Sequence, residues 1–295
     1  MKVLISGSSG LVGSALVFNL IADGHQVFRL VRSDKEDGIF WNPDQPIQDK
    51  KSLEGFDAVV HLAGDNISEG RWNEAKKQKI RSSRTTGTRY LAETLASLND
   101  PPKCFICASA SGYYGDRGEE LLTEDSGPGH GFLADVCQEW EASTQPVVDR
   151  GIRTVFTRFG IILSPKGGAL KKMLPPFKMG LGGKIGSGNQ YWSWIDLDDT
   201  VGIIQFCLAN DSLQGPVNVS TPEPVTAETF TDTLGRVLKR PSLFPVPAFA
   251  AKLAFGEMAE ALLLASFRMK PAKLISAGYN FAFPDLESSL RHLLT

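Results

Sequence analysis

Three glycines near the start of the chain have the spacing of a phosphate-binding loop. Gly7, Gly10 and Gly13 form a GxxGxxG pattern between the apolar run of residues 2–5 and a helical pattern over residues 11–23. Glycines in such a loop permit a tight turn and let the backbone approach a pyrophosphate, which the amide groups of the first helical turn then face. The pattern predicts a dinucleotide cofactor, and the alternative is a glycine-rich turn of purely structural use. The predicted contacts of this loop are Gly7, Ser9, Gly10, Leu11 and Val12.

The end of the second predicted strand, residues 26–32, indicates which dinucleotide binds. A site for NAD usually has an acidic side chain here, which accepts a hydrogen bond from the ribose 2′-hydroxyl. In this chain Val31 occupies that place, and Arg32 and Ser33 follow. A guanidinium can bind a 2′-phosphate through two hydrogen bonds, so Val31 and Arg32 favour NADP. The alternative is an ordinary surface arginine, and Asp34 adds a negative charge nearby.

Length and composition describe an ordinary globular protein. The chain has 295 residues, 42% of them hydrophobic, and a net charge of −2. It can form one large domain, or one and a half, with a substantial core. The charge balance argues against a general role in binding nucleic acid or membranes. The first apolar stretch is too short for a signal peptide, and no run reaches about 18 apolar residues, so we expect a cytoplasmic protein.

The four cysteines fit neither a zinc pattern nor a disulfide framework. Cys104 and Cys107 have the spacing of a redox pair. They lie in a predicted strand, however, where positions i and i+3 point to opposite faces. We therefore expect buried thiols in a reducing compartment and no metal site.

Strand-like and helix-like segments alternate through residue 163, which predicts an α/β fold with a Rossmann-type, doubly wound parallel sheet. The predicted strands are 2–6, 26–32, 57–62, 103–109 and 153–158, and the predicted helices are 11–23, 72–98 and 131–150. The later part contains glycine-rich and mixed segments, including predicted helices over 227–238, 248–267 and 286–294. We therefore assign residues 1–165 mainly to a nucleotide-binding domain. Residues 166–295 are predicted to form a smaller α+β substrate lobe with a helical C-terminal extension.

Several short motifs carry a resemblance to a known family. The chain resembles an extended short-chain dehydrogenase/reductase through the GxxGxxG loop, His61–Gly64, Tyr114-Gly115 and Trp194–Asp199. More narrowly, it resembles the NAD-dependent epimerase family, which also has the old label of cell division inhibitor family. The signatures of that group are Gly64–Ile67, Gly70–Asn73, Lys79–Arg84 and Gly112–Gly115. Its C-terminal extension, of unassigned function, matches Gly256–Ala259, Pro271–Leu274 and Phe283–Leu286.

The resemblance implies NADP as the cofactor and adds contacts to it. Leu62, Ala63 and Gly64 would line the adenosine side, Arg84 would approach from the long helix, and Ile161 and Ile162 would flank the nicotinamide. Arg84 also has support from the residues, because seven basic side chains and one acid lie between Arg71 and Arg89. A solvated basic face is the alternative for the lysines of this helix.

The catalytic pair of ordinary short-chain reductases is missing. Those enzymes use a Tyr-x-x-x-Lys pair, in which lysine lowers the tyrosine pKa for proton transfer. None of the five tyrosines here is followed by lysine at the fourth position, and no lysine lies between Lys103 and Lys166. Aligning Glu141 with the glutamate that usually follows the pair puts Leu133 and Cys137 in the two catalytic positions.

Other side chains are candidates for proton transfer or ligand contact. Tyr113 and Tyr114 follow the carboxyl end of a predicted strand, where ligands bind in open α/β sheets; packing or a substrate wall is the alternative. The usual catalytic hydroxyl is replaced by Ala110, and the adjacent Ser109 is assigned to the cofactor site. His130 lies in a glycine-rich loop, where an exposed histidine is the simpler interpretation. Two tryptophans, at positions 192 and 194, fit either a ligand wall or the core between the lobes.

These observations leave two hypotheses of different kinds. The first is an NADP-dependent oxidoreductase or epimerase-like enzyme, acting on a small carbonyl or hydroxyl compound with non-standard proton transfer. The second is a non-catalytic NADP(H)-binding sensor, which the missing Tyr/Lys pair favours. A nucleotide-sugar substrate is suggested by fold-level analogy alone. We expect a monomer or homodimer.

Overall fold

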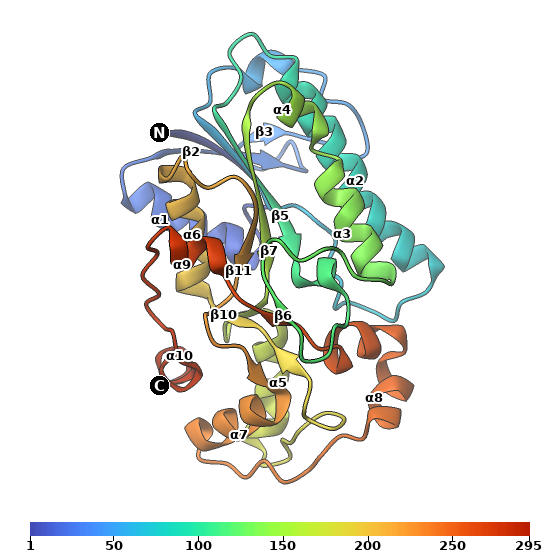
Figure 1. The fold of residues 1–295 in the computed structure, drawn as a ribbon. Coiled ribbons are helices and arrows are strands. Elements are labelled where there is room, and N and C mark those ends of the chain that lie inside the picture. The colour runs from blue at the N-terminus through green and yellow to red at the C-terminus, as the bar shows by residue number, and fades with distance from the viewer.

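The computed structural model describes all 295 residues and has a central sheet of seven parallel strands (Figure 1). The strand order is β11-β7-β5-β4-β1-β2-β3. Because the chain runs outward from β1 in both directions, the order reverses beside β1, which is where open α/β sheets bind ligands. The predicted doubly wound parallel sheet is confirmed. The strands are β1 (Lys2–Ser6), β2 (Gln26–Val31), β3 (Ile39–Phe40), β4 (Ala58–His61), β5 (Cys104–Ala110), β7 (Arg153–Phe159) and β11 (Gly215–Val219).

Helices cover both faces of this sheet (Figure 1). On one face lie α1 (Leu11–Ala22) and α6 (Leu197–Ala209), and on the other lie α2 (Glu74–Ala96), α3 (Phe132–Ala142) and α4 (Gln145–Asp149). Successive residues of a strand point to opposite faces of the sheet, so alternate residues of the same strands pack into two separate cores, one on each face. Cys104 belongs to the first core and Cys107 to the second, so the predicted opposite orientation of these thiols is confirmed. All four cysteines are buried and free.

The smaller lobe is built from short strand pairs and helices. Its core contains Trp192, Trp194 and Phe230, so the two tryptophans pack in the interior instead of lining an open surface. The helices of this lobe and the C-terminal extension are α5 (Gly168–Lys178), α7 (Ala227–Leu238), α8 (Ala248–Phe255), α9 (Ala272–Ser276) and α10 (Leu286–Leu294). The strand pairs are β8 (Ile161–Leu163) with β10 (Trp194–Asp196), β9 (Tyr191–Trp192) with β12 (Val225–Thr226), and β6 (Leu121–Leu122) with β13 (Arg268–Met269).

Two predicted helices are each broken in the structure. The helix expected over 131–150 divides into α3 and α4, because Pro146 has no N–H to continue the helical hydrogen bonds. The helix expected over 248–267 ends at Phe255. There Gly256 adopts a φ of +62°, a left-handed conformation that ends a helix, and a separate π-helical turn follows at Ala259–Leu264.

The chain crosses between the two lobes more than once. After β8 and β10 in the smaller lobe, α6 and β11 return to the large sheet, where β11 pairs with β7. Segment 197–219 lies beyond residue 165 but packs with the nucleotide-binding part of the chain. The domain boundary at residue 165 therefore stays a prediction. None of the helices combines the length and apolar character that a membrane span requires.

Candidate cofactor site

The glycine-rich loop connects β1 to α1, and its three glycines have different surroundings. A Cβ on Gly7, whose φ is +70°, would lie 2.7 Å from the carbonyl carbon of Leu62. A Cβ on Gly13 would lie 2.8 Å from the Cα of Ser8, so both glycines are required by packing within the protein. A Cβ on Gly10 would meet one atom, the Gly7 carbonyl oxygen at 3.2 Å. Gly10 is exposed, so its backbone is the part of the loop that a ligand can approach closely.

The first turn of α1 presents unpaired amide groups beside Gly10. The N-cap residue is Gly10 itself, which has no side chain to accept their hydrogen bonds, and no acidic side chain lies in this turn. The N–H groups of Leu11, Val12 and Gly13 have no acceptor within the protein. An uncapped helix N-terminus of this kind favours an anion such as a pyrophosphate.

Two arginines lie at the β2 side of the loop. Val31 is buried at the end of β2, and Arg32 follows it with an exposed side chain. Arg29 points toward the loop, and its Nε donates a hydrogen bond to Ser8 Oγ at 3.0 Å. The sequence interpretation missed Arg29, although it shares a strand face with Val31 and could have been found by that alternation. Arg29 also lies 3.9 Å from Glu36, so Arg32 is the arginine at this strand end that makes no ion pair.

The segment after β4 contacts both the loop and α2. Leu62 and Ala63 pack against Gly7. Gly64 lies beside the guanidinium of Arg84, because a Cβ placed on Gly64 would be 3.4 Å from Arg84 Cζ. Arg84 Nη1 donates to the carbonyl oxygens of Asp65 and Ile80, at 3.1 and 3.2 Å. Its guanidinium stacks over Trp140, 5.1 Å from the ring, and burial lowers its pKa. The structure thus brings together the predicted residues of the loop, the β4 end and α2.

The predicted nicotinamide side lies at β8. Ile161 and Ile162 are partly buried there. Gly168 lies between Ile162 and Leu11. A Cβ placed on Gly168 would be 3.4 Å from the carbonyl oxygen of Ile162 and 3.9 Å from Cδ2 of Leu11. Ile162 and the start of α1 are therefore neighbours, as a cofactor spanning both requires.

His61, at the end of β4, has a structural environment. Its Nδ1 is 2.6 Å from Ser6 Oγ and its Nε2 is 2.9 Å from Thr88 Oγ1, which also accepts a hydrogen bond from Trp140 Nε1. Complete burial lowers the pKa of His61 to about 4. This ring is therefore neutral and ties β4 to α2.

Polar side chains at the ends of β5 and β7 form a buried network, which we call the Glu141–Arg158 network. Arg158 donates to both carboxylate oxygens of Glu141, from Nε at 2.9 Å and from Nη2 at 2.8 Å. Ser109 Oγ donates to the same carboxylate at 2.6 Å. The Ser109 hydroxyl, predicted as a cofactor contact, is thus engaged inside the protein. Although burial alone lowers the pKa of Arg158, the hydrogen bonds and charge of Glu141 raise it overall.

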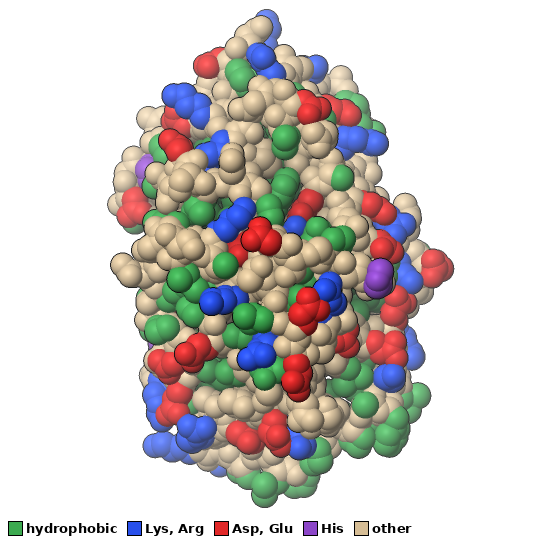
Figure 2. Space-filling model, in the orientation of Figure 1, with side chains coloured by type: hydrophobic (Ala, Val, Ile, Leu, Met, Phe, Trp, Pro, Cys, Tyr) green, Lys and Arg blue, Asp and Glu red, His purple; other side chains and the backbone are tan.

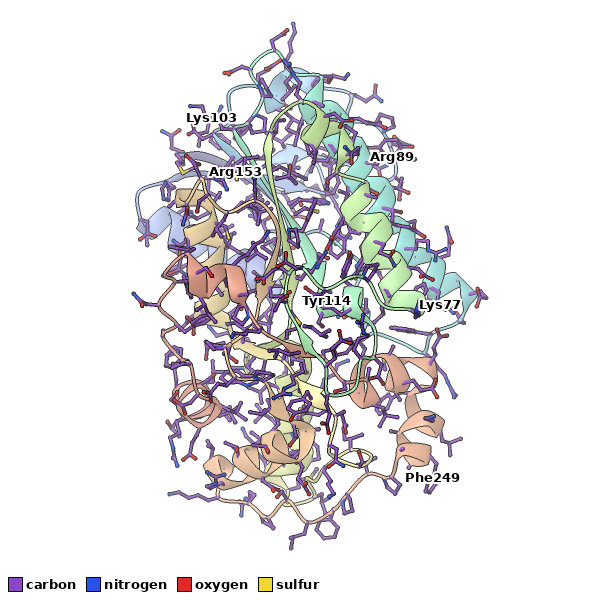
Figure 3. The ribbon with its side chains drawn as sticks, in the orientation of Figure 1. Lys77, Arg89, Lys103, Tyr114, Arg153 and Phe249 are labelled. Atoms are coloured by element: carbon purple, nitrogen blue, oxygen red, sulfur yellow. The ribbon has the colours of Figure 1, made fainter.

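The two candidate tyrosines differ in their surroundings. Tyr114 is fully buried in the centre of the molecule (Figure 3), and its hydroxyl donates to Asn218 Oδ1 at 2.6 Å and accepts from Arg158 Nη1 at 3.0 Å. Burial raises the pKa of Tyr114 to about 12. Tyr113 is partly exposed, its ring lies 3.4 Å from the Arg158 guanidinium carbon, and its hydroxyl has no partner within the protein. Tyr113 is therefore the tyrosine whose proton a ligand can reach.

Helix α3 presents two unreactive side chains to this region. A Cβ on Gly112 would lie 3.1 Å from Leu133 Cβ and 3.6 Å from Cys137 Sγ, so both side chains face the turn that carries the tyrosines. Burial raises the pKa of the Cys137 thiol to about 12. His130, just before α3, is exposed. No basic side chain from α3 reaches the tyrosines, and the arginine on Tyr113 comes from β7 instead.

One cluster elsewhere has the spacing of metal ligands. Asp196, Asp198 and His292 bring their ligand atoms within 4.8 Å of one another. Both carboxylate oxygens of Asp196 already accept hydrogen bonds, from Ser289 Oγ and from the backbone N–H of Asp198. This arrangement caps α6 and links it to α10.

The comparisons with known proteins agree with this geometry. A model of the NAD dependent epimerase/dehydratase family matches residues 3–220, and one for a domain of unknown function (DUF1731) matches residues 246–293. The chain belongs to the NAD-dependent epimerase/dehydratase family. This confirms the resemblance stated from the motifs, including the separate C-terminal extension.

Relatives of this epimerase-family chain match along nearly its whole length. Epimerase family protein Mb2239 of Mycobacterium bovis is 42% identical over 99% of this chain and 97% of its own. Human epimerase family protein SDR39U1 is 33% identical over the whole of both chains. The crystal structure of human SDR39U1 (isoform 2) with NADPH matches at a TM-score of 0.92, with 32% identity over 99% of each chain. A UDP-glucuronic acid 4-epimerase from Bacillus cereus, 16% identical, has a TM-score of 0.81 over 99% of this chain and 98% of its own, and so shares the fold.

Proposed function

We propose that this chain binds NADP(H) along the carboxyl edge of the sheet. The observation that carries the proposal is the first turn of α1, where three unpaired amide groups flank the exposed backbone of Gly10. Arg29 lies on the adjacent strand β2 and Arg32 directly follows it, and Val31 stands at the strand end where a site for NAD usually has an acidic side chain. Although Glu36 lies 3.9 Å from Arg29, the two arginines favour the 2′-phosphate over a bare ribose. That human SDR39U1 was crystallised with NADPH supports the same assignment.

Each predicted contact then has a place along the cofactor. Leu62, Ala63 and Gly64 would face the adenosine half, Arg84 would neutralise phosphate charge, and Ile161 and Ile162 would flank the nicotinamide. Ser109 is better assigned to positioning Glu141, because its hydroxyl is already bound. The residues proposed for the pyrophosphate and the ribose are Gly7, Ser9, Gly10, Leu11, Val12, Val31 and Arg32.

We propose that the reaction is the reduction of a small carbonyl compound or the oxidation of the matching alcohol. The bound nicotinamide would supply or accept the hydride. In the reductive direction Tyr113 would donate its phenolic proton to the carbonyl oxygen, and Arg158, fixed by Glu141, would hold the ring in place. Tyr114 is not assigned this role, because its hydroxyl already donates a hydrogen bond to Asn218 and accepts one from Arg158.

A non-catalytic NADP(H) sensor is the second candidate. It is favoured by Leu133 and Cys137, which stand where short-chain reductases have tyrosine and lysine and supply neither a phenol nor a positive charge. The four free, buried cysteines fit the expected cytoplasmic location for either function.

The cofactor proposal is tested by calorimetric titration with NADPH and NADH. NADPH is expected to bind more tightly, and Arg32→Ala should weaken NADPH binding by about 1.5–3 kcal/mol with little effect on NADH. Arg150→Ala is the matched control, because Arg150 is exposed and precedes β7 at the opposite edge of the sheet. Equal affinities of the unmodified protein for the two cofactors would refute the proposal. The two candidate functions are then separated by measuring NADPH oxidation with a panel of carbonyl compounds. An enzyme should oxidise NADPH with at least one of them, and a sensor should not.

A further inference from the structure

The first part of the C-terminal extension contacts the N-terminal end of α2. Lys77 Nζ lies 3.0 Å from Glu257 Oε2. Arg71 Nη2 donates a hydrogen bond to the carbonyl oxygen of Leu253 at 3.2 Å. Figure 3 places Lys77 at the right-hand edge of the molecule, and in Figure 2 acidic and basic side chains lie close together along that edge. We call this contact the α2–extension interface. Its residues are Arg71, Trp72 and Lys77 on one side, and Leu253, Glu257 and Met258 on the other.

An apolar cluster forms the centre of this interface. Trp72 and Met258 are only 8% and 9% exposed. They pack with Ile80 of α2 and Val136 of α3. Leu133, whose side chain faces the turn that carries the tyrosines, packs against the same cluster. A partly exposed ion pair contributes little to stability, so the apolar cluster supplies most of the stability of the interface.

The segment 65–73, which precedes α2, connects this interface to the candidate cofactor site. Trp72 Nε1 donates a hydrogen bond to the carbonyl oxygen of Ile67 at 2.8 Å. The carboxylate of Asp65 accepts a hydrogen bond from Lys76 Nζ at 2.6 Å, which ties the start of the segment to α2. The carbonyl oxygen of Asp65 accepts a hydrogen bond from Arg84 Nη1 at 3.1 Å. An unbroken series of contacts therefore leads from the extension to Arg84.

Arg84 is the residue through which these contacts can affect a bound cofactor. Only its Nη1 has acceptors within the protein, and both are backbone carbonyl oxygens, of Asp65 and Ile80. The Asp65 carboxylate is paired with Lys76 and Lys79, so the charge of Arg84 has no carboxylate of its own. Its remaining N–H groups are free to bind a phosphate. Because two backbone carbonyls fix the guanidinium, its position depends on segment 65–73 and on the first turns of α2.

We propose that the C-terminal extension positions Arg84 for cofactor binding, with Glu257 and Met258 as the positioning residues. The inference rests on the proposed cofactor site. In this role the extension acts through α2 and segment 65–73, and not by contact with the cofactor. The family model that matches residues 246–293 describes a domain of unknown function. The interface gives the first part of this domain a role in setting cofactor affinity.

Hydrogen exchange and calorimetric titration of Met258→Ala test the proposal. Without cofactor, the amides of segment 65–73 should exchange about 10-fold faster than in the unmodified protein, because Trp72 loses its apolar partner. The Kd values for NADPH and NADH should both rise about 10-fold, because Arg84 would bind phosphate groups that the two cofactors share. This equal effect differs from that of Arg32→Ala, which should act mainly on NADPH.

A double-variant cycle with Arg84→Met separates positioning from a general loss of stability. Once the guanidinium is removed, Met258→Ala should raise Kd by less than about 2-fold further. Leu286→Ala is the matched control. Leu286 belongs to the same extension and is 6% exposed, but it packs in the core of the smaller lobe. The control should lower Tm and leave both the Kd values and the exchange of segment 65–73 unchanged.

Any of three results would overturn the proposal. The first is unchanged exchange of segment 65–73 in Met258→Ala, and the second is faster exchange with unchanged Kd values. The third is an undiminished effect of Met258→Ala in the Arg84→Met background, which would show that the extension does not act through Arg84. If the unmodified protein binds neither cofactor, the proposed function itself is refuted, and that titration needs no variant.

A charge reversal replaces Met258→Ala if circular dichroism shows that this variant is unfolded. Glu257→Lys puts a like charge beside Lys77 on the partly exposed rim of the interface and should have the same effects on exchange and Kd. Its matched control is Glu260→Lys, which puts a like charge beside Lys252 within the extension. Equal effects of the two reversals would overturn the proposal.

Discussion

Replacing Glu141 by glutamine should destabilise the protein strongly. Glu141→Gln keeps the shape of the side chain and an oxygen for the Ser109 hydroxyl, but removes the negative charge. The side chain of Arg158 is only 3% exposed, so its positive charge would remain buried without a counter-charge. Removing one partner of a buried ion pair typically costs about 3–5 kcal/mol.

Thermal unfolding followed by circular dichroism measures this loss. For a chain of this size each kcal/mol lowers Tm by about 2–4 °C, so we expect Glu141→Gln to unfold about 6–20 °C below the unmodified protein. Glu120→Gln is the control, because Glu120 pairs with Arg117 at 2.7 Å on the surface. Surface pairs contribute about 0–1 kcal/mol, so the control should stay within about 4 °C of the unmodified protein.

Two outcomes would refute this reasoning. If Glu141→Gln unfolds within about 2 °C of the unmodified protein, the buried charge of Arg158 does not depend on Glu141. The double variant Glu141→Leu/Arg158→Met removes both charges and should unfold at a higher temperature than Glu141→Gln. A double variant that is less stable than the single one would show that packing, and not the unpaired charge, causes the loss.

Three other predictions concern the loop, the tyrosines and pH. Gly10→Val should abolish dinucleotide binding while the circular dichroism spectrum stays native, because its Cβ meets only one protein atom, and unchanged titration calorimetry would exclude this site. Once a substrate is known, Tyr113→Phe should lower the rate by about 10²–10⁴-fold, whereas Tyr114→Phe should mainly lower stability. Full activity in Tyr113→Phe would place the acid elsewhere. Because burial lowers the His61 pKa to about 4, the unfolded chain alone binds this proton between about pH 6.5 and 4. Stability should therefore fall by about 3 kcal/mol as pH drops through that window, and urea unfolding should show a smaller fall in His61→Gln.

The elements predicted from sequence are those with local causes. The strand before Gly7, the helix after Gly10 and the long helix α2 follow from apolar periodicity and glycine spacing, and the structure contains all three. The breaks at Pro146 and Gly256 were also visible in the sequence but were outweighed by the helical patterns around them. Strands and helices were predicted correctly where neighbouring residues determine them. The predicted helix bounds were wrong where a single residue interrupts a long helical pattern.

The arrangement around the tyrosines could not be predicted in the same way. Tyr113 and Tyr114 are adjacent and chemically identical in the sequence, and only tertiary packing buries one hydroxyl and leaves the other free. The partner of Tyr114 is Asn218, 104 residues away, on a strand that returns from the smaller lobe. Arg158 was predicted only as a strand end. Contacts of such sequence separation leave no short-range pattern.

The repeated passage of the chain between the lobes limits how the protein can move. A lobe attached by one linker can rotate as a rigid body, but here the chain passes between the lobes several times, including on either side of β6 and near Gly160, Asp196 and Ser220. A hinge motion would have to bend all of these segments at once and separate β11 from β7. We therefore expect ligands to be enclosed by small loop displacements at the carboxyl edge of the sheet, and the two lobes to unfold as one cooperative unit.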